Sequence, residues 1–141
     1  YSVVATTAAY DPKEFAHAGS SRIRVERFVP HHHVIARSEV VVCHGGMGIT
    51  QRALAAGVPV VIVPYGRDQL EVARRVEYAG VGVTLLPPSL NPQTLSKAVR
   101  KARAMAEGAQ RMAELFAEAG GASLAADSVA ELAGTRISSP A

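Results

Sequence analysis

An unbroken apolar run at residues 58–63, reading Val-Pro-Val-Val-Ile-Val, is the feature that most restricts the fold of this chain. A strand with one face in water alternates apolar and polar side chains, and this run does not. Continuous runs of β-branched residues are typical of strands in parallel sheets that are covered on both faces. The run therefore predicts a central strand with a helical layer on each side.

The rest of the chain alternates between strand-like and helix-like segments. Strands are predicted at 2–7, 23–28, 40–43, 58–63 and 81–86, and residues 8–22 are predicted to be loop with at most a helical turn. Helices are predicted at 31–37, 48–56, 68–79 and 91–107, with Asp68 and Asn91 as N-caps, Gly108 as a break, and two shorter apolar faces following on either side of Gly120-Gly121. This order favours an α/β fold, a Rossmann-like parallel sheet with helices on both faces.

The chain has 141 residues, of which 48% are hydrophobic, enough for one domain at 1–134 with a short tail at 135–141. Cys43 is the single cysteine, so an internal disulfide and a cysteine-based zinc site are excluded. Its place after a valine run indicates a small buried hydrophobic residue. This usage favours a reducing, cytoplasmic setting.

The net charge of +3 is mild, and the arginines are spread along the chain. A nucleic-acid surface would combine a basic stripe with stacking aromatics, and neither is present, so a small anionic ligand is the expected partner. No apolar stretch approaches the roughly 18 residues that span a bilayer. The start has neither a basic n-region nor an initiator Met, which indicates a chain cut from something larger rather than a signal peptide.

A glycine-rich turn, His44-Gly45-Gly46-Met47-Gly48, joins a predicted strand to a predicted helix that Gly57 closes. Backbone N–H groups at a helix N-terminus lack partners, and the helix dipole favours negative charge there. Such a turn suits phosphate. Thr50 either adds a hydroxyl to this site or is simply a residue of the first helical turn.

Three turns follow predicted strands, at 28–31, 44–50 and 65–69. In parallel α/β sheets, ligands bind at the carboxyl ends of the strands. We therefore expect the three turns to line one site.

Several ordered motifs resemble the nucleotide-sugar signature of the family-1 glycosyltransferases of GT-B fold, in particular the bacterial branch that decorates natural products and lipids. The motifs are Phe28-Val29-Pro30-His31, His44-Gly45-Gly46-Met47-Gly48, the segment 53–59, and Pro64 followed by Asp68-Gln69. The match covers residues 27–83, and the segment around 120–127 is similar to the helical end of the same domain.

The resemblance implies the donor-binding, C-terminal one of two Rossmann-like domains. The family's second strand matches residues 3–6, so the first strand and helix of that domain are expected to be missing. The catalytic base would lie in an N-terminal acceptor-binding domain, so no catalytic residue is expected here and the chain alone is expected to be inactive. The family needs no metal and no other cofactor, and His31-His32-His33 is not predicted to be a metal site.

The resemblance also assigns roles to the turns. His44 would donate to the β-phosphate of the donor, and Gly45, Gly46, Met47 and Gly48 would bring backbone to the diphosphate, with Thr50 a further candidate.

Other positions match the sugar and base contacts of the family. Asp68 and Gln69 would bind the hydroxyls of the donor sugar, with Arg67 as a weaker candidate. Phe28, Val29 and His31 would hold the base, although Phe28 is as well explained by packing in the core.

Two positions depart from the family pattern. Ile49 replaces a Ser or Thr that contacts phosphate, and Arg52 replaces a Glu that accepts from ribose hydroxyls. Arginine has no acceptor. Arg52 therefore indicates a deoxyribose donor such as a thymidine diphosphate sugar, a phosphate contact, or an ordinary surface residue.

Two functions remain open. One is the donor-binding half of an inverting glycosyltransferase that uses a UDP- or dTDP-sugar. The other is a non-catalytic module that binds nucleotide sugar, which the losses at Ile49 and Arg52 would fit. A sugar-nucleotide epimerase is less favoured, because no carboxylates flank the glycine turn.

Overall fold

The computed structural model describes residues 1–18 and 21–134 and divides into two compact units, Tyr1–Ser38 and a second that begins at Glu39. The tail predicted at 135–141 lies outside the described residues. No helix in the described part of the chain is long and apolar enough to cross a membrane.

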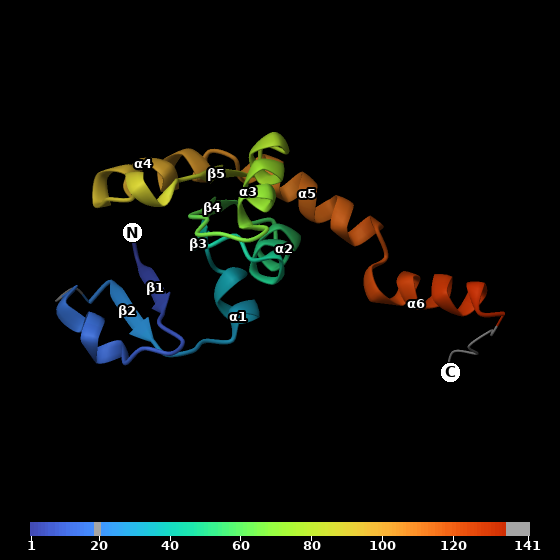
Figure 1. Ribbon diagram of the computed structural model, residues 1–141, viewed down its shortest axis with the longest axis horizontal. Helices are drawn as coiled ribbons and strands as arrows, with labels where there is room; N and C mark the ends of the chain where they lie inside the picture. Colours follow the sequence, from blue (N-terminus) through green and yellow to red (C-terminus); the bar gives the residue numbers. More distant parts are fainter. Residues whose placement is uncertain (19–20, 135–141) are drawn as a thin grey trace. The chain divides into compact units, whose positions relative to one another are not determined.

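The first unit holds two parallel strands, paired from Val3 with Ile23 to Thr6 with Glu26. Both strands were predicted, and the connection between them contains a 3-10 helix where a loop with a helical turn was expected. The elements, drawn in blue and cyan in Figure 1, are β1 (Val3–Thr6), η1 (Pro12–Ala18), β2 (Ile23–Glu26) and α1 (His31–Ile35).

The second unit holds a three-stranded parallel sheet in the order β3-β4-β5, in which β4 is central. Val42 pairs with Val61, which in turn pairs with Val83. The elements are β3 (Val41–Cys43), α2 (Met47–Ala55), β4 (Val60–Ile62), α3 (Gln69–Tyr78), β5 (Gly82–Thr84), η2 (Pro87–Ser89), α4 (Pro92–Arg103), α5 (Ala106–Glu118) and α6 (Gly121–Leu132).

Helices cover the three-stranded sheet on both faces, with α4 on one side and α2 and α3 on the other (Figure 1). All three residues of β4 are fully buried. Val61 and Val83 face α4, where they pack with Ala98 and Ala102. Because neighbouring strand residues point to opposite faces, Gly82 faces the other layer, and a Cβ there would lie 2.5 Å from Cγ1 of Val76 in α3.

The predicted fold class, parallel strands with helices on both faces, is therefore confirmed. The prediction did not separate the strands into two sheets, one in each unit. Strand patterns identify strands but do not determine which of them pair, because pairing depends on contacts between distant segments.

The prediction that Gly108 breaks the long helix is wrong, since it lies inside α5 and the break falls between α4 and α5. A Cβ at Gly108 would lie 2.8 Å from the carbonyl oxygen of Gly80. This glycine therefore allows a helix to approach a neighbouring turn closely. The predicted break at Gly120 is confirmed, with φ of +70° there.

Candidate functional site

The turns that follow β3 and β4 lie against each other. Gly45 has φ of +89°, and a Cβ there would lie 2.7 Å from Cγ2 of Ile62 and 3.3 Å from the carbonyl oxygen of Gln69. Only glycine combines that backbone conformation with so close an approach. The structure thus brings the glycine turn together with the Asp68-Gln69 pair, as the sequence predicted.

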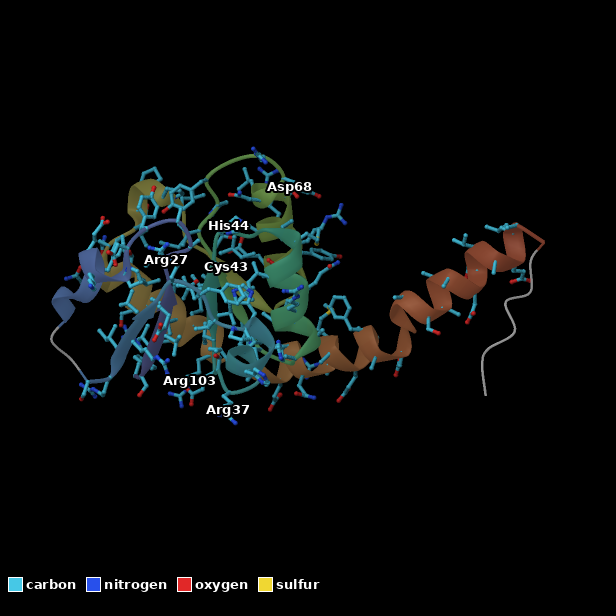
Figure 2. The ribbon with its side chains drawn as sticks, turned by 90° about the horizontal axis from the view of Figure 1, so that it is seen from below. Arg27, Arg37, Cys43, His44, Asp68 and Arg103 are labelled. Carbon is cyan, nitrogen blue, oxygen red and sulfur yellow. The ribbon has the colours of Figure 1, made fainter. Side chains whose placement is uncertain are left out.

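The imidazole of His44 lies over Gly46. A Cβ at Gly46 would lie 2.6 Å from Nε2 of His44, so a side chain at that position would occupy the place of the ring. Gly46 is the N-cap of α2, and His44 is exposed. The ring is therefore held beside a helix N-terminus and remains open to solvent. Figure 2 shows His44 and Asp68 at the same end of the second unit.

The first turn of α2 offers backbone donors. The first N–H that bonds within the helix is that of Thr50, which donates to the carbonyl of Gly46, and no side chain caps the helix. Among the described residues, the N–H groups of Met47, Gly48 and Ile49 have no recorded partner. Together with the helix dipole, these donors and His44 form a site suited to an anion.

The hydroxyl of Thr50 points away from such a ligand. Thr50 is 2% exposed, and its Oγ1 donates to the carbonyl oxygen of Gly46 at 3.0 Å. The Sγ atom of Cys43 lies 3.9 Å from the same Oγ1. This geometry favours the alternative in which Thr50 is a structural residue of the first helical turn.

Cys43 is partly buried, where the sequence predicts a small buried hydrophobic residue. Burial raises the pKa of its thiol, and hydrogen bonding with the Gly45 backbone and the Thr50 side chain partly opposes that shift. The group is therefore a neutral thiol beneath the glycine turn.

The turn before α3 is closed by Gln69 and not by Asp68. Asp68 occupies the predicted N-cap position, but its side chain makes no capping hydrogen bond and is exposed. Instead Oε1 of Gln69 accepts from the backbone N–H of Tyr65 at 2.8 Å and of Gly66 at 3.2 Å. The residue pattern did not predict this arrangement, and the proximity of Gln69 to the glycine-containing turn is its only sequence signal. No described residue is recorded as a partner of the Asp68 carboxylate, which is therefore available to a ligand.

The two arginine candidates differ in backbone conformation. Arg67 precedes Asp68 and has φ of +56°, a left-handed conformation that is uncommon for a residue other than glycine. Arg52 lies in the last turn of α2 and is exposed. Strained backbone conformations cluster at ligand-binding sites, so the conformation of Arg67 supports its candidacy as a ligand-binding residue.

The three predicted base-binding residues lie in the first unit. Phe28 is 75% exposed, which disfavours the core role considered for it, and its ring centroid lies 6.3 Å from that of His31. Val29 and His31 are half-buried. Within residues 1–18 and 21–134, no cluster of three or more His, Cys, Asp or Glu side chains could hold a metal ion.

Comparison with known proteins identifies the family. Residues 2–132 match the model of the erythromycin biosynthesis protein CIII-like, C-terminal domain. The chain is 41% identical over 98 residues to 4'-demethylrebeccamycin synthase of Lentzea aerocolonigenes, covering 70% of this chain and 23% of that protein. It is 42% identical over 95 residues to a PGL/p-HBAD biosynthesis glycosyltransferase of Mycobacterium tuberculosis, covering 65% of this chain and 22% of that protein.

Solved structures agree. The calicheamicin glycosyltransferase CalG4 superposes with a TM-score of 0.86 at 31% identity, over 94% of this chain and 36% of that one. The glycosyltransferase VinC, solved in complex with DTDP, gives 0.62 at 30% identity, over 79% of this chain and 29% of that one. The chain thus spans about a quarter of the length of these curated relatives and about a third of these solved chains. The resemblance read from the motifs is confirmed, and the chain belongs to the erythromycin biosynthesis protein CIII-like C-terminal domain family of GT-B glycosyltransferases.

Proposed function

We propose that this chain is the donor-binding domain of an inverting glycosyltransferase. The enzyme would move a sugar from a UDP- or dTDP-sugar to a hydroxyl of a small molecule or lipid. The observation that carries the proposal is the close approach of Gly45 to Ile62 and Gln69, which joins the glycine turn to the turn that carries the exposed side chains of Arg67 and Asp68. One ligand with a diphosphate and a sugar would satisfy both turns.

The diphosphate would bind at the start of α2. The N–H groups of Met47 and Gly48 and the ring of His44 would donate to its oxygens, with Gly45 and Gly46 allowing close approach. When the bond from the sugar to the diphosphate breaks, negative charge grows on the departing oxygen. Donors fixed in advance at that position stabilise the transition state more than the ground state.

The sugar would lie against the start of α3. Asp68 would accept hydrogen bonds from its hydroxyls, while Gln69 and Arg67 would donate to them. Phe28, Val29 and His31 would hold the nucleobase, with the exposed ring of Phe28 available for stacking.

The acceptor and its activation would belong to an N-terminal domain of the full-length enzyme. A base in that domain would deprotonate the acceptor hydroxyl, which would attack the anomeric carbon from the face opposite the diphosphate and invert it. The coverage of the relatives supports this division, since the matched segment is 23% of the rebeccamycin synthase relative and 22% of the relative named as a PGL/p-HBAD biosynthesis glycosyltransferase. A reducing, cytoplasmic setting remains part of the proposal.

Titration calorimetry with UDP-glucose and dTDP-glucose tests whether the chain binds nucleotide sugars. We expect saturable binding of at least one of them, with no turnover by the chain alone. Absence of binding to either would argue against the proposal.

The position of Arg52 favours a specific second experiment. If Arg52 reflects a deoxyribose donor, dTDP binds at least as tightly as UDP, and Arg52→Glu shifts the preference toward UDP by supplying an acceptor for ribose. Lys101→Glu, the same charge change on exposed α4, controls for general electrostatics. A clear preference of the unaltered chain for UDP contradicts the deoxyribose explanation.

The non-catalytic module remains the alternative, because Ile49 and Arg52 remove two contacts of the family pattern. A transfer assay on the full-length protein with an aglycone acceptor separates the two. Nucleotide-sugar binding without transfer or hydrolysis would favour the module.

A further inference from the structure

The side chain of Gln69 closes a ring of hydrogen bonds around the turn that precedes it. Its Oε1 accepts from the N–H groups of Tyr65 and Gly66, and its own backbone N–H donates to the carbonyl oxygen of Gly66 at 3.3 Å. Three bonds between one residue and a two-residue stretch fix the turn to the start of α3.

This ring determines the polarity of the Gln69 carboxamide. A carboxamide oxygen has two lone pairs, and both are directed here to backbone N–H groups. The N–H groups of Nε2 have no recorded partner among the described residues. The amide is half-buried, and its remaining capacity toward a ligand is donation alone.

The same ring holds a strained residue in place. Arg67, with φ of +56°, lies between Gly66 and Asp68, so its left-handed backbone is enclosed by the bonds that Gln69 makes. Strain of this kind persists where the surroundings fix the backbone. Asp68, the residue that follows Arg67, is exposed, and Gln69 is half-buried.

We propose that Gln69 is a positioning residue that locks residues 65–68, and that it meets the donor sugar only as a hydrogen-bond donor. This inference rests on the proposed function for its ligand. The turn would then present one group that only accepts, Asp68, beside one that only donates, Gln69. The sugar it fits carries an oxygen acceptor opposite Gln69 and a hydroxyl that donates to Asp68, and loss of that acceptor oxygen would weaken binding.

The lock is testable without any ligand, by comparing Gln69→Met and Gln69→Glu. Methionine keeps the length of the side chain and removes the acceptor, whereas glutamate keeps the acceptor. We expect hydrogen exchange of the Tyr65 and Gly66 amides to accelerate at least about tenfold in Gln69→Met and to stay protected in Gln69→Glu. The amide of Leu85, which bonds to Ile62 in the sheet, is the internal control for folding. Unchanged protection of Tyr65 and Gly66 in Gln69→Met would overturn the lock.

The donor-only role is testable by the ratio of the dissociation constants of UDP-glucose and UDP, or of the thymidine pair if that binds more tightly. Both ligands carry a diphosphate, so repulsion between that group and the carboxylate introduced by Gln69→Glu affects both dissociation constants and largely cancels in their ratio. We expect Gln69→Glu, with its turn still protected, to weaken the sugar nucleotide relative to the nucleotide by about tenfold. A wild-type ratio in Gln69→Glu would overturn the donor role. Failure of the unaltered chain to bind any nucleotide would instead refute the proposed function and leave the exchange result standing.

Discussion

At the scale of single residues, the His44 ring occupies space that is open only because Gly46 has no side chain. The ring would lie within 2.6 Å of a Cβ at that position. Gly48, two residues further on, has no atom within 4 Å of the corresponding point. An alanine would therefore collide with the His44 ring at position 46 but would meet no such neighbour at position 48.

We predict that Gly46→Ala displaces the imidazole and lowers nucleotide affinity by about tenfold, the loss of one good hydrogen bond. Gly48→Ala should instead raise the free energy of unfolding by about 0.5–1 kcal/mol, because alanine is the better helix former. Calorimetric titration and urea denaturation measure the two effects. A Gly46→Ala variant that binds nucleotide as tightly as the unaltered chain would show that the ring has no fixed role.

A substitution at Thr50 distinguishes a structural role of its hydroxyl from a role in ligand binding. Its buried hydroxyl bonds to the carbonyl of Gly46. We predict that Thr50→Val, which preserves shape, lowers the free energy of unfolding by about 1 kcal/mol. The affinity for nucleotide should change less than it does in Gly46→Ala. If affinity falls at least as far in Thr50→Val as in Gly46→Ala, the hydroxyl belongs to the phosphate site after all.

The sequence predicted the glycine turn and the neighbouring Asp68-Gln69 pair, because glycine requirements and motif spacing are local. Its N-cap prediction placed Asp68 correctly at the start of α3, but the Asp68 side chain makes no capping hydrogen bond. Asp68 has the residue type and position of an N-cap, but Gln69 makes the bonds that close the turn. Residue type predicts what a side chain is able to do, whereas the path of the preceding loop decides which side chain does it.

At the scale of elements, α4 has the most complete N-terminal signal in the chain, and the structure confirms it. Oδ1 of Asn91 accepts from the N–H groups of Gln93 and Thr94, and Oγ1 of Thr94 accepts from the N–H of Asn91. Pro92 occupies the first helical position, where its missing N–H costs nothing.

We predict that Asn91→Ala lowers the free energy of unfolding by about 1 kcal/mol, because two backbone donors lose their acceptor. The same denaturation series should show almost no effect of Gln93→Ala, an exposed neighbour for which no side-chain bond is recorded. Equal effects of the two variants would mean that side-chain removal in general, and not the cap, is responsible.

Element boundaries were harder to predict than element types. The strands and helices were predicted in the correct order, because apolar periodicity depends on local sequence. The apolar pattern predicts a break at Gly108, yet this glycine lies inside α5, where it faces the carbonyl of Gly80. That contact joins residues distant in sequence, so no local pattern reveals it.

At the scale of the whole molecule, the sequence predicted parallel strands between helical layers but not their division between two sheets. The family relationship rests on nearly the full chain, residues 2–132. The chain nevertheless spans about a quarter of the length of these curated relatives. In the proposed function, acceptor choice and the catalytic base belong to residues beyond this chain. Binding of the nucleotide-sugar donor is the part of the proposed function that experiments on this chain test directly.

The most direct test of that claim is the dissociation constant of UDP and dTDP for the unaltered chain, for His44→Phe and for His44→Gln, measured by titration calorimetry. Phenylalanine keeps the ring and removes its hydrogen bonds, whereas glutamine retains a donor. We predict that His44→Phe weakens the tighter nucleotide by at least about tenfold and that His44→Gln recovers part of the loss. Equal affinities of the three proteins would contradict the placement of the diphosphate at the glycine turn.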